Sequence, residues 1–260
     1  MIKITEEKTF VDGLRINYKV AGSGPAILVL HGWGGSSDSW VKVTEFLAEK
    51  GFKVFSLDFP GFGKSATPKD TWGIKAYTDF VFGFAKKMEL KEFFLLGHSF
   101  GGRVSIRFSV LYPGKVKKLV LCASAGIKGN LDFKARVIYM VARLGNMVFS
   151  PKIMARLKDS ARNVLYTFLR RKDYVKAKGV MKEVMKKVIE EDLSSDLGKI
   201  KSETLVVWGE KDKLVPLKYA YIFKEKVKNS ELEVIPGIGH SPHLECPKEL
   251  SSIILKFLKK

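Results

Sequence analysis

The hydrophobic positions of this chain follow two patterns, unbroken apolar runs and helical spacing, which alternate along the sequence. Short unbroken apolar runs, such as residues 26–30 and 93–96, are bounded by glycine or polar residues, as are strands buried on both faces of a parallel sheet. Between such runs, residues 39–50 and 75–90 carry apolar side chains at helical spacing. Strands that alternate with helices predict βαβ units. Right-handed crossovers then place the loops after the strands along one sheet edge, where ligands of such sheets bind.

Further segments extend both patterns along the chain. Asp12-Gly13 is a two-residue turn signal inside residues 10–20, where apolar and polar positions alternate, and the two features predict a β-hairpin. The same criteria predict strands at 53–57, 116–122, 203–208 and 231–235, and helices at 217–227 and 248–258. The whole set predicts an α/β fold whose mostly parallel central sheet has helices on both faces.

The alternation of strands and helices stops over residues 128–199. Apolar side chains recur there at helical spacing, with no strand pattern between them, in three stretches: 133–148, 153–168 and 180–189. We therefore expect a helical cap inserted into a core domain that consists of residues 1–127 and 200–260. The insertion carries 17 Lys and Arg residues against 8 Asp and Glu residues, so it supplies +9 of the net charge of +19.

The high net charge, from 46 Lys and Arg residues against 27 Asp and Glu residues, would suit nucleic acid, an anionic lipid surface or an acidic substrate. The basic residues are scattered among apolar positions, however, and no nucleic-acid-binding motif accompanies them. We therefore favour a lysine-rich solvated surface and expect no nucleic-acid partner. No apolar run reaches the roughly 20 residues that span a bilayer, so we expect no stable membrane insertion.

Two further features concern the compartment. The first eight residues contain no apolar segment of the kind that a signal peptide requires. The two cysteines are Cys122 and Cys246, and Cys122 ends a predicted buried strand, which favours two free thiols in a reducing environment over a disulfide. We expect a cytoplasmic protein, and the sequence leaves its oligomeric state open.

The strongest chemical signal is the Gly-x-Ser-x-Gly pentapeptide at residues 97–101. An apolar strand precedes it and a helical segment follows it, which is the context of a nucleophile elbow. In such a turn the strand and the helix approach closely, and glycine leaves the room that they need. Ser99 would then stand at the carboxyl edge of the sheet, at the positive end of the following helix.

Other loops at the same predicted edge carry candidate chemistry. Residues 31–35, His-Gly-Trp-Gly-Gly, follow a central strand and expose backbone N–H groups that can stabilise an oxyanion. Asp58 begins a turn-rich loop, where a carboxylate more often organises the loop through backbone hydrogen bonds than takes part in chemistry. A serine nucleophile needs a base with its own orienting group, and His240, His243 and Asp212 lie in loops after the last two predicted strands.

Taken together, five stretches resemble the serine hydrolases of the α/β-hydrolase fold superfamily that carry a helical cap. The stretches are His-Gly-Trp-Gly-Gly (31–35), Asp-Phe-Pro-Gly-Phe-Gly-Lys-Ser (58–65), Gly-His-Ser-Phe-Gly-Gly (97–102), Trp-Gly-Glu-Lys-Asp (208–212) and Gly-His-Ser-Pro-His-Leu-Glu-Cys-Pro (239–247). The order of serine, aspartate and histidine along the chain is also that of the family. The resemblance covers nearly the whole chain except the cap.

The resemblance implies roles for individual residues. It makes Ser99 the nucleophile, His240 the general base and acid, and Asp212 the residue that orients His240. His240 follows a Gly-x-Gly pattern and precedes Glu245 of a Glu-x-Pro pattern, as in the family, so His243 is interpreted as a neighbour. The implied catalytic unit is a Ser-His-Asp triad, with neither a metal nor a cofactor.

The resemblance also implies an oxyanion hole and a substrate pocket beside the triad. The backbone N–H groups of Trp33 and Phe100 would bind the oxyanion. We expect His31, Trp33, His98 and Phe100 to line the substrate pocket.

The predicted activity is hydrolysis of small-molecule carboxylic esters of short to medium acyl chains. Serine at position 99 excludes the haloalkane dehalogenases and epoxide hydrolases of this fold, which carry aspartate there. Lipases, lactonases, amidases, perhydrolases and carbon–carbon bond hydrolases of dienone acids remain, and the basic cap mildly favours the dienone acids because they carry a carboxylate. A hydrolase-like receptor with slow turnover is a further alternative.

Overall fold

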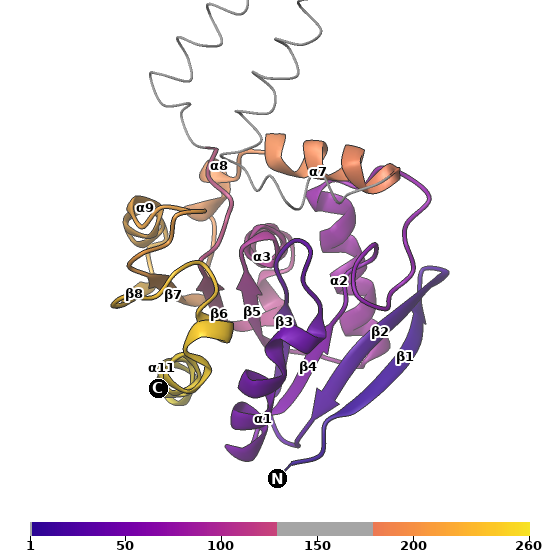
Figure 1. Cartoon of the computed structure of the whole chain (residues 1–260), viewed down its shortest axis with the longest axis horizontal. Coiled ribbons are helices and arrows are strands. Elements are labelled where there is room, and N and C mark those ends of the chain that lie inside the picture. The colour runs from indigo at the N-terminus through magenta and orange to yellow at the C-terminus, as the bar shows by residue number, and fades with distance from the viewer. Residues whose placement is uncertain (1, 129–178) are drawn as a thin grey trace, which may run out of the picture.

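The computed structural model describes residues 2–128 and 179–260, and an eight-stranded sheet runs through them in the order β1-β2-β4-β3-β5-β6-β7-β8 (Figure 1). The strands are β1 (Thr5–Val11), β2 (Leu14–Ala21), β3 (Ala26–Leu30), β4 (Lys53–Leu57), β5 (Phe93–His98), β6 (Val116–Cys122), β7 (Glu203–Gly209) and β8 (Ser230–Ile235). Strand β2 is antiparallel to both of its neighbours, and β3 to β8 are parallel. The predicted α/β class with a mostly parallel sheet is therefore confirmed.

Helices cover both faces of the sheet, as predicted (Figure 1). One face packs against α1 and α11, and the other packs against α2, α3 and α9. The helical elements are η1 (Ser37–Trp40), α1 (Val41–Glu49), α2 (Ile74–Lys87), α3 (Phe100–Leu111), η2 (Pro113–Lys115), α7 (Val180–Glu190), α8 (Ser194–Leu197), α9 (Lys218–Lys226), α10 (Pro242–Glu245) and α11 (Pro247–Lys259).

The unbroken apolar runs of the strands follow from this double cover. On β3, Leu28 and Leu30 enter the core on the α2–α3 side, whereas Ile27 and Val29 enter the core on the α1–α11 side. Successive side chains of a strand point to opposite faces, so a strand covered twice must be apolar at every position. The two cores hold the strands rigid and leave their carboxyl ends free to carry loops.

Several element boundaries differ from the predicted ones by a few residues. The helix predicted over 75–90 ends at Lys87, and Glu89 adopts a positive φ of 55° that no helix continues through. The apolar pattern at 180–189 forms α7, which buries Met181, Val184, Met185 and Val188. The other two apolar stretches of the predicted cap, 133–148 and 153–168, lie outside the described residues, and the domain boundaries at 127 and 200 stay a prediction.

The described residues that flank positions 129–178 lie together. Leu193 N–H donates to the carbonyl oxygen of Gly126 at 2.8 Å, and Lys128 N–H donates to the Asp192 carboxylate at 3.3 Å. The carboxylate of Glu191, just after α7, accepts a hydrogen bond of 2.9 Å from the first N–H of α2, at Ile74. The described residues on either side of 129–178 therefore meet beside the start of α2.

Within residues 2–128 and 179–260, no helix combines the length and the hydropathy that a bilayer span requires. The same part of the chain contains no cluster of three or more His, Cys, Asp or Glu side chains that could hold a metal ion. Both cysteines, Cys122 and Cys246, are free thiols, as predicted.

Candidate active site

Ser99 sits in the tight turn between β5 and α3, with a backbone φ of 51° and ψ of −107°. A side-chain-bearing residue rarely adopts this conformation, which costs on the order of 1–3 kcal/mol. Neighbouring chain segments hold the turn: Ser99 N–H donates to the carbonyl oxygen of Cys122 at 3.2 Å, and the carbonyl oxygen of Ser99 accepts from Ala125 N–H at 3.1 Å. The loop after β6 therefore fixes the strained turn in place.

The glycines of the turn permit a close approach of backbone to backbone. A Cβ atom built on Gly101 would clash with the carbonyl oxygen of Leu30 on the neighbouring strand. A Cβ atom on Gly97 would clash with the Ser105 hydroxyl and the carbonyl oxygen of Gly101. Side chains at these two positions would force α3 away from the sheet, so the elbow requires glycine there.

The structure brings Ser99, Asp212 and His240 together from three different loops. His240 Nε2 lies 3.0 Å from Ser99 Oγ, and His240 Nδ1 lies 2.7 Å from Asp212 Oδ2. All three residues are buried. Because a carboxylate only accepts hydrogen bonds, Nδ1 carries the proton, and Nε2 is left to accept the Ser99 hydroxyl proton.

Asp212 is itself held by the start of the loop that follows it. Its Oδ1 atom accepts hydrogen bonds from Leu214 N–H at 2.8 Å and Val215 N–H at 2.9 Å. The Asx-type turn that results points Oδ2 at the imidazole of His240. One carboxylate oxygen therefore shapes the loop, and the other orients the histidine.

The histidines at the other positions contact the backbone or other rings. His31 is buried, its Nδ1 donates to the carbonyl oxygen of Gly32 at 2.7 Å, and its Nε2 accepts from Phe59 N–H at 3.0 Å. Burial lowers the pKa of the His31 imidazole below its ordinary value, which keeps the ring neutral. His243 stacks on Trp40 with the ring centroids 4.4 Å apart.

His98 Nε2 lies 2.9 Å from the carbonyl oxygen of His240. Its ring also packs 4.4 Å from the ring of His243. Through Nε2, His31 and His98 each connect two loops. The placement of these two residues in a substrate pocket stays a prediction.

The loop after β3 lies directly on the elbow, as an oxyanion hole would require. A Cβ atom built on Gly32 would lie 2.7 Å from His98 Nδ1 and 3.4 Å from Ser99 Cβ. Phe100 supplies the first N–H of α3, and the first N–H groups of a helix have no partner inside the helix. The Trp33 ring packs edge-on against the Phe100 ring at 5.4 Å.

Asp58 occupies a comparable place after β4 and has a different set of partners. Its carboxylate accepts hydrogen bonds from Ser37 N–H at 2.6 Å, Lys64 N–H at 2.9 Å and Asn17 Nδ2 at 3.0 Å. The prediction that Asp58 organises its loop is confirmed.

An aromatic cluster adjoins the elbow on the side of α2 and α7. Phe62 lies edge-on to Trp33 with a centroid distance of 4.8 Å, and Tyr77 lies edge-on to Phe100 at 5.0 Å. Met181 of α7 packs against Gly61, next to Phe62 in sequence. The described surroundings of Phe100 are therefore apolar.

Comparison with known proteins decides the family. The sequence profile of the family described as alpha/beta hydrolase fold matches residues 25–247 of this chain. The chain belongs to this family. Among curated relatives, this α/β hydrolase is 30% identical to 2-hydroxy-6-oxononadienedioate/2-hydroxy-6-oxononatrienedioate hydrolase 1 of Pseudomonas putida, over 99% of each chain. It is 26% identical to a monoacylglycerol lipase of Rattus norvegicus, over 91% of this chain and 76% of the lipase.

A solved structure gives the same result for the fold. This α/β hydrolase superimposes on a serine hydrolase involved in carbazole degradation with a TM-score of 0.76 and 26% identity, over 99% of each chain. The three similar proteins are all hydrolases, but their names mention different compounds. The fold and the hydrolase family are therefore established, and the substrate is a separate question.

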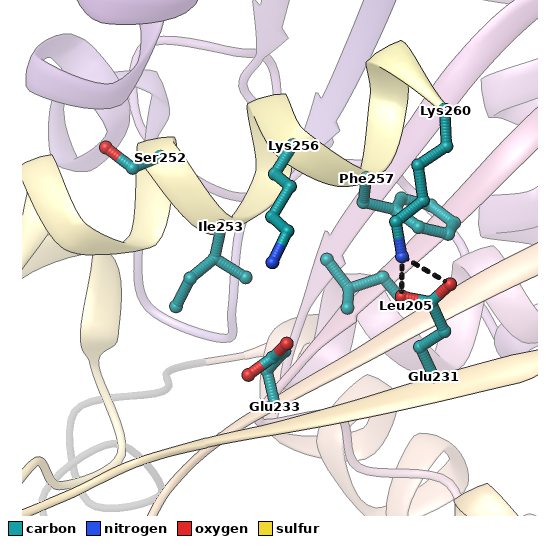
Figure 2. A pocket seen from close by; sticks show the side chains of 8 residues that line it. All are labelled: Leu205, Glu231, Glu233, Ser252, Ile253, Lys256, Phe257 and Lys260. Atoms are coloured by element: carbon teal, nitrogen blue, oxygen red, sulfur yellow. Dashed lines mark hydrogen bonds and ion pairs between the residues drawn. The ribbon is translucent and has the colours of Figure 1, made fainter.

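The α/β hydrolase also has a surface pocket between β8 and α11 (Figure 2). An ion pair between Lys260 and Glu231 closes one side of it. The lining residues are Leu205, Glu231, Glu233, Ser252, Ile253, Lys256, Phe257 and Lys260. None of them belongs to the triad, so this pocket is separate from the candidate active site.

Proposed function

We propose that this protein is a serine hydrolase that cleaves small-molecule carboxylic esters of short to medium acyl chains. The observation that carries the proposal is the continuous hydrogen-bonded series of Ser99, His240 and Asp212, with distances of 3.0 Å and 2.7 Å. A serine hydroxyl is a weak nucleophile at neutral pH, and such a series is the arrangement that activates it.

In the first half of the proposed reaction, Ser99 Oγ attacks the ester carbonyl carbon while His240 Nε2 takes the hydroxyl proton. The carbonyl oxygen becomes an oxyanion, which the backbone N–H groups of Trp33 and Phe100 bind. The tetrahedral intermediate then collapses, and the alcohol leaves with the proton that His240 returns. Asp212 stabilises the imidazolium that exists between the two proton transfers.

In the second half, His240 takes a proton from water, and the hydroxide attacks the acyl group on Ser99. Collapse of the second intermediate releases the carboxylic acid, and the proton from His240 returns to Ser99 Oγ. The fixed turn at Ser99 supports both steps, because the nucleophile needs no reorientation between them.

The preference for an apolar acyl group rests on the aromatic cluster beside the elbow. The rings of Trp33, Phe62 and Phe100, the last of which directly follows Ser99, pack against one another. Arg103, one turn further along α3, is buried, and its Nη1 donates to the carbonyl oxygen of Glu191 at 2.7 Å. Burial lowers the pKa of the Arg103 guanidinium to about 10, so the group stays charged near neutrality. Its Nη1 atom is used for the hydrogen bond with Glu191.

A second candidate is hydrolysis of a carbon–carbon bond in a dienone acid. It is favoured by the 30% identity, over 99% of each chain, to a hydrolase that is named for two such dicarboxylates. This reaction would use the same three residues and would also require cations that hold the substrate carboxylates.

A panel of substrates tests the two candidates. For esters, kcat/KM should rise a few-fold per methylene from p-nitrophenyl acetate to butyrate or hexanoate and then decline, because each buried methylene contributes about 0.8 kcal/mol. A dienone acid should react slowly at any salt concentration. Fast, salt-sensitive cleavage of the dienone acid with a flat ester profile would replace the ester proposal with the second candidate. Stoichiometric labelling of Ser99 by a fluorophosphonate with negligible turnover of both substrates would favour a receptor.

A further inference from the structure

The candidate base stands on a loop rather than on a helix or a strand. His240 lies between the end of β8 at Ile235 and the single turn of α10, which starts at Pro242. Its two ring nitrogens must keep 3.0 Å and 2.7 Å contacts with residues that come from other loops. A shift of about 1 Å at such a site can cost on the order of 10²-fold in rate, so the main chain of His240 must itself be held.

Glu245 holds the main chain on both sides of His240. Its Oε2 atom accepts a hydrogen bond from Gly239 N–H at 2.8 Å, and its Oε1 atom accepts one from Ser241 N–H at 2.9 Å. One carboxylate therefore spans the residue between the two N–H groups. The contact with Ser241 is similar to that of a capping box, in which an acidic side chain reaches back to the N–H of the N-cap residue.

His98 holds the third main-chain group, the carbonyl oxygen of His240 itself. The distance from His98 Nε2 to this oxygen is 2.9 Å, and because a carbonyl only accepts, Nε2 is the donor. His98 is buried and immediately precedes Ser99. The hydrogen bond therefore joins the elbow of the nucleophile directly to the loop of the base.

We propose that Glu245 and His98 are positioning residues for His240, which they hold by the main-chain groups at positions 239, 240 and 241. The inference rests on the proposed function in one respect, since it takes His240 to be the base. Loss of either side chain lets the loop move while Ser99, Asp212 and the aromatic cluster stay in place. The chemical step slows and substrate binding is preserved.

The first experiment compares Glu245→Ala with Glu210→Ala. Glu210 is the matched control, because its carboxylate accepts a hydrogen bond of 2.8 Å from Gly237 N–H, in the same loop but two residues short of Gly239. With the best ester of the panel, Glu245→Ala should lower kcat about 10- to 100-fold and leave KM within twofold. Glu210→Ala should leave both constants within twofold.

The second experiment tests His98 with a variant that keeps the donor. In His98→Gln, the side-chain amide N–H replaces Nε2–H, whereas His98→Leu fills the space without a donor. The expected order of kcat is wild type, then Gln, then Leu, with the Leu variant at least tenfold below wild type. Equal kcat for the Gln and Leu variants would remove His98 from the proposal, whatever their stability.

A spectroscopic readout separates positioning from general stabilisation. The proton between His240 Nδ1 and Asp212 should give a resolved downfield resonance in the proton NMR spectrum of the wild type. Glu245→Ala should shift or broaden this resonance, and Glu210→Ala should not. An unchanged resonance and unchanged kcat in Glu245→Ala, or equal losses in both glutamate variants, would overturn the proposal.

The rate of Ser99 phosphonylation by a fluorophosphonate distinguishes this inference from the proposed function. The reagent needs the activated serine but no ester-specific pocket. If the wild type is labelled rapidly and hydrolyses no ester, and Glu245→Ala is labelled at least tenfold more slowly, the ester proposal fails and the positioning role holds. If the wild type is not labelled at Ser99, the serine hydrolase proposal fails, and the NMR resonance still decides whether Glu245 positions His240.

Discussion

Two pairs of buried residues, each an aspartate with a histidine, lie at the same edge of the sheet and have different hydrogen-bond partners. Asp58 and His31 follow β4 and β3, and Asp212 and His240 follow β7 and β8. All four residues are less than a tenth exposed. Residue type, burial and position after a parallel strand are therefore the same for both pairs.

The two pairs differ in how many of their side-chain donors and acceptors already bind groups of the surrounding loops. The carboxylate of Asp58 accepts three hydrogen bonds from Ser37, Lys64 and Asn17, and both ring nitrogens of His31 bind backbone groups. Asp212 uses one oxygen for its own loop and the other for His240. The imidazole of His240 therefore keeps one nitrogen for a third partner, and that partner is Ser99. The chemistry of such a pair therefore depends on which of its polar atoms are not already used to hold the loops.

The largest expected effect comes from replacing Ser99, which contacts His240. Ser65, which contacts Asp58, serves as its counterpart in the other pair. Ser99→Ala should lower kcat on the order of 10⁶-fold, because in a triad the loss of the nucleophile costs about as much as the loss of all three residues. Ser65 lies next to Asp58, where its hydroxyl donates to the Asp58 carbonyl oxygen at 2.8 Å. Ser65→Ala should lower the free energy of unfolding by about 1 kcal/mol and leave kcat within twofold. Ester turnover and urea unfolding measure the two effects, and Ser99→Ala with more than 1% of wild-type kcat would contradict the comparison.

The second effect separates the carboxylates. Asp212→Asn should lower kcat about 10⁴-fold with little change in stability, because an amide donor facing Nδ1 favours the wrong imidazole tautomer. Asp58→Asn should leave kcat of the folded protein within a few-fold but lower the free energy of unfolding by about 2–3 kcal/mol, because the amide N–H₂ would face a buried donor. Kinetics and denaturation of the two variants side by side check this. A dead Asp58→Asn with an active Asp212→Asn would exchange the two assignments.

The sequence predicted much of this arrangement, for identifiable reasons. The turn at residues 97–101 was predictable because only glycine fits where two backbone segments approach closely. The strands were predictable because both faces of the sheet are covered, which requires unbroken apolar runs. In contrast, Asp58 and Asp212 both follow a predicted strand, and only loop chemistry and family resemblance separated them in advance. The directions of the His31 and His98 side chains depend on loops that are distant in sequence, so no local pattern could predict them.

Glu245 lies between the features that have a local sequence signal and those that have none. The Glu-x-Pro pattern marks this glutamate in the sequence but predicts no contact for it. A proline at the first helical position followed by an acidic residue in the first turn is a helix-start signal, and it could have predicted that Glu245 reaches back to Ser241. The second hydrogen bond, to Gly239, follows from the shape of the loop and has no local signal.

The third effect is a pH dependence of the free energy of unfolding, and it arises from His31, the histidine of the pair with Asp58. Burial lowers the pKa of His31 below its ordinary value of 6.5, so below that pH the unfolded chain binds a proton that the native protein does not. Stability that is present above pH 6.5 is therefore lost as the pH falls, by up to about 1.4 kcal/mol per pH unit from this site. His31→Gln, whose side-chain oxygen can accept from Phe59 N–H, should lose less stability than wild type between pH 7 and pH 5. Urea unfolding at both pH values measures this, and equal losses would show that native His31 is protonated as readily as in the unfolded chain.

The smallest effect concerns the exposed edge of the Asp58 loop. Lys64, whose N–H binds Asp58, also binds Glu6 through Nζ at 2.6 Å, and this hydrogen bond lowers the pKa of Glu6 to about 2. Because the pKa is lowered, the contribution is present above the ordinary value of 4.5 and is lost as the pH falls toward 2. The Lys64 end of the pair is exposed and the Glu6 end is partly exposed, so Glu6→Gln should lower the stability only slightly at pH 7 and low salt, and almost not at all in 1 M NaCl. Unfolding curves at the two salt concentrations check this, with ester turnover unchanged in both. A loss of turnover in Glu6→Gln would mean that the Asp58 loop affects the chemistry proposed for Ser99, and Asp58 and His31 could no longer be assigned a purely structural role.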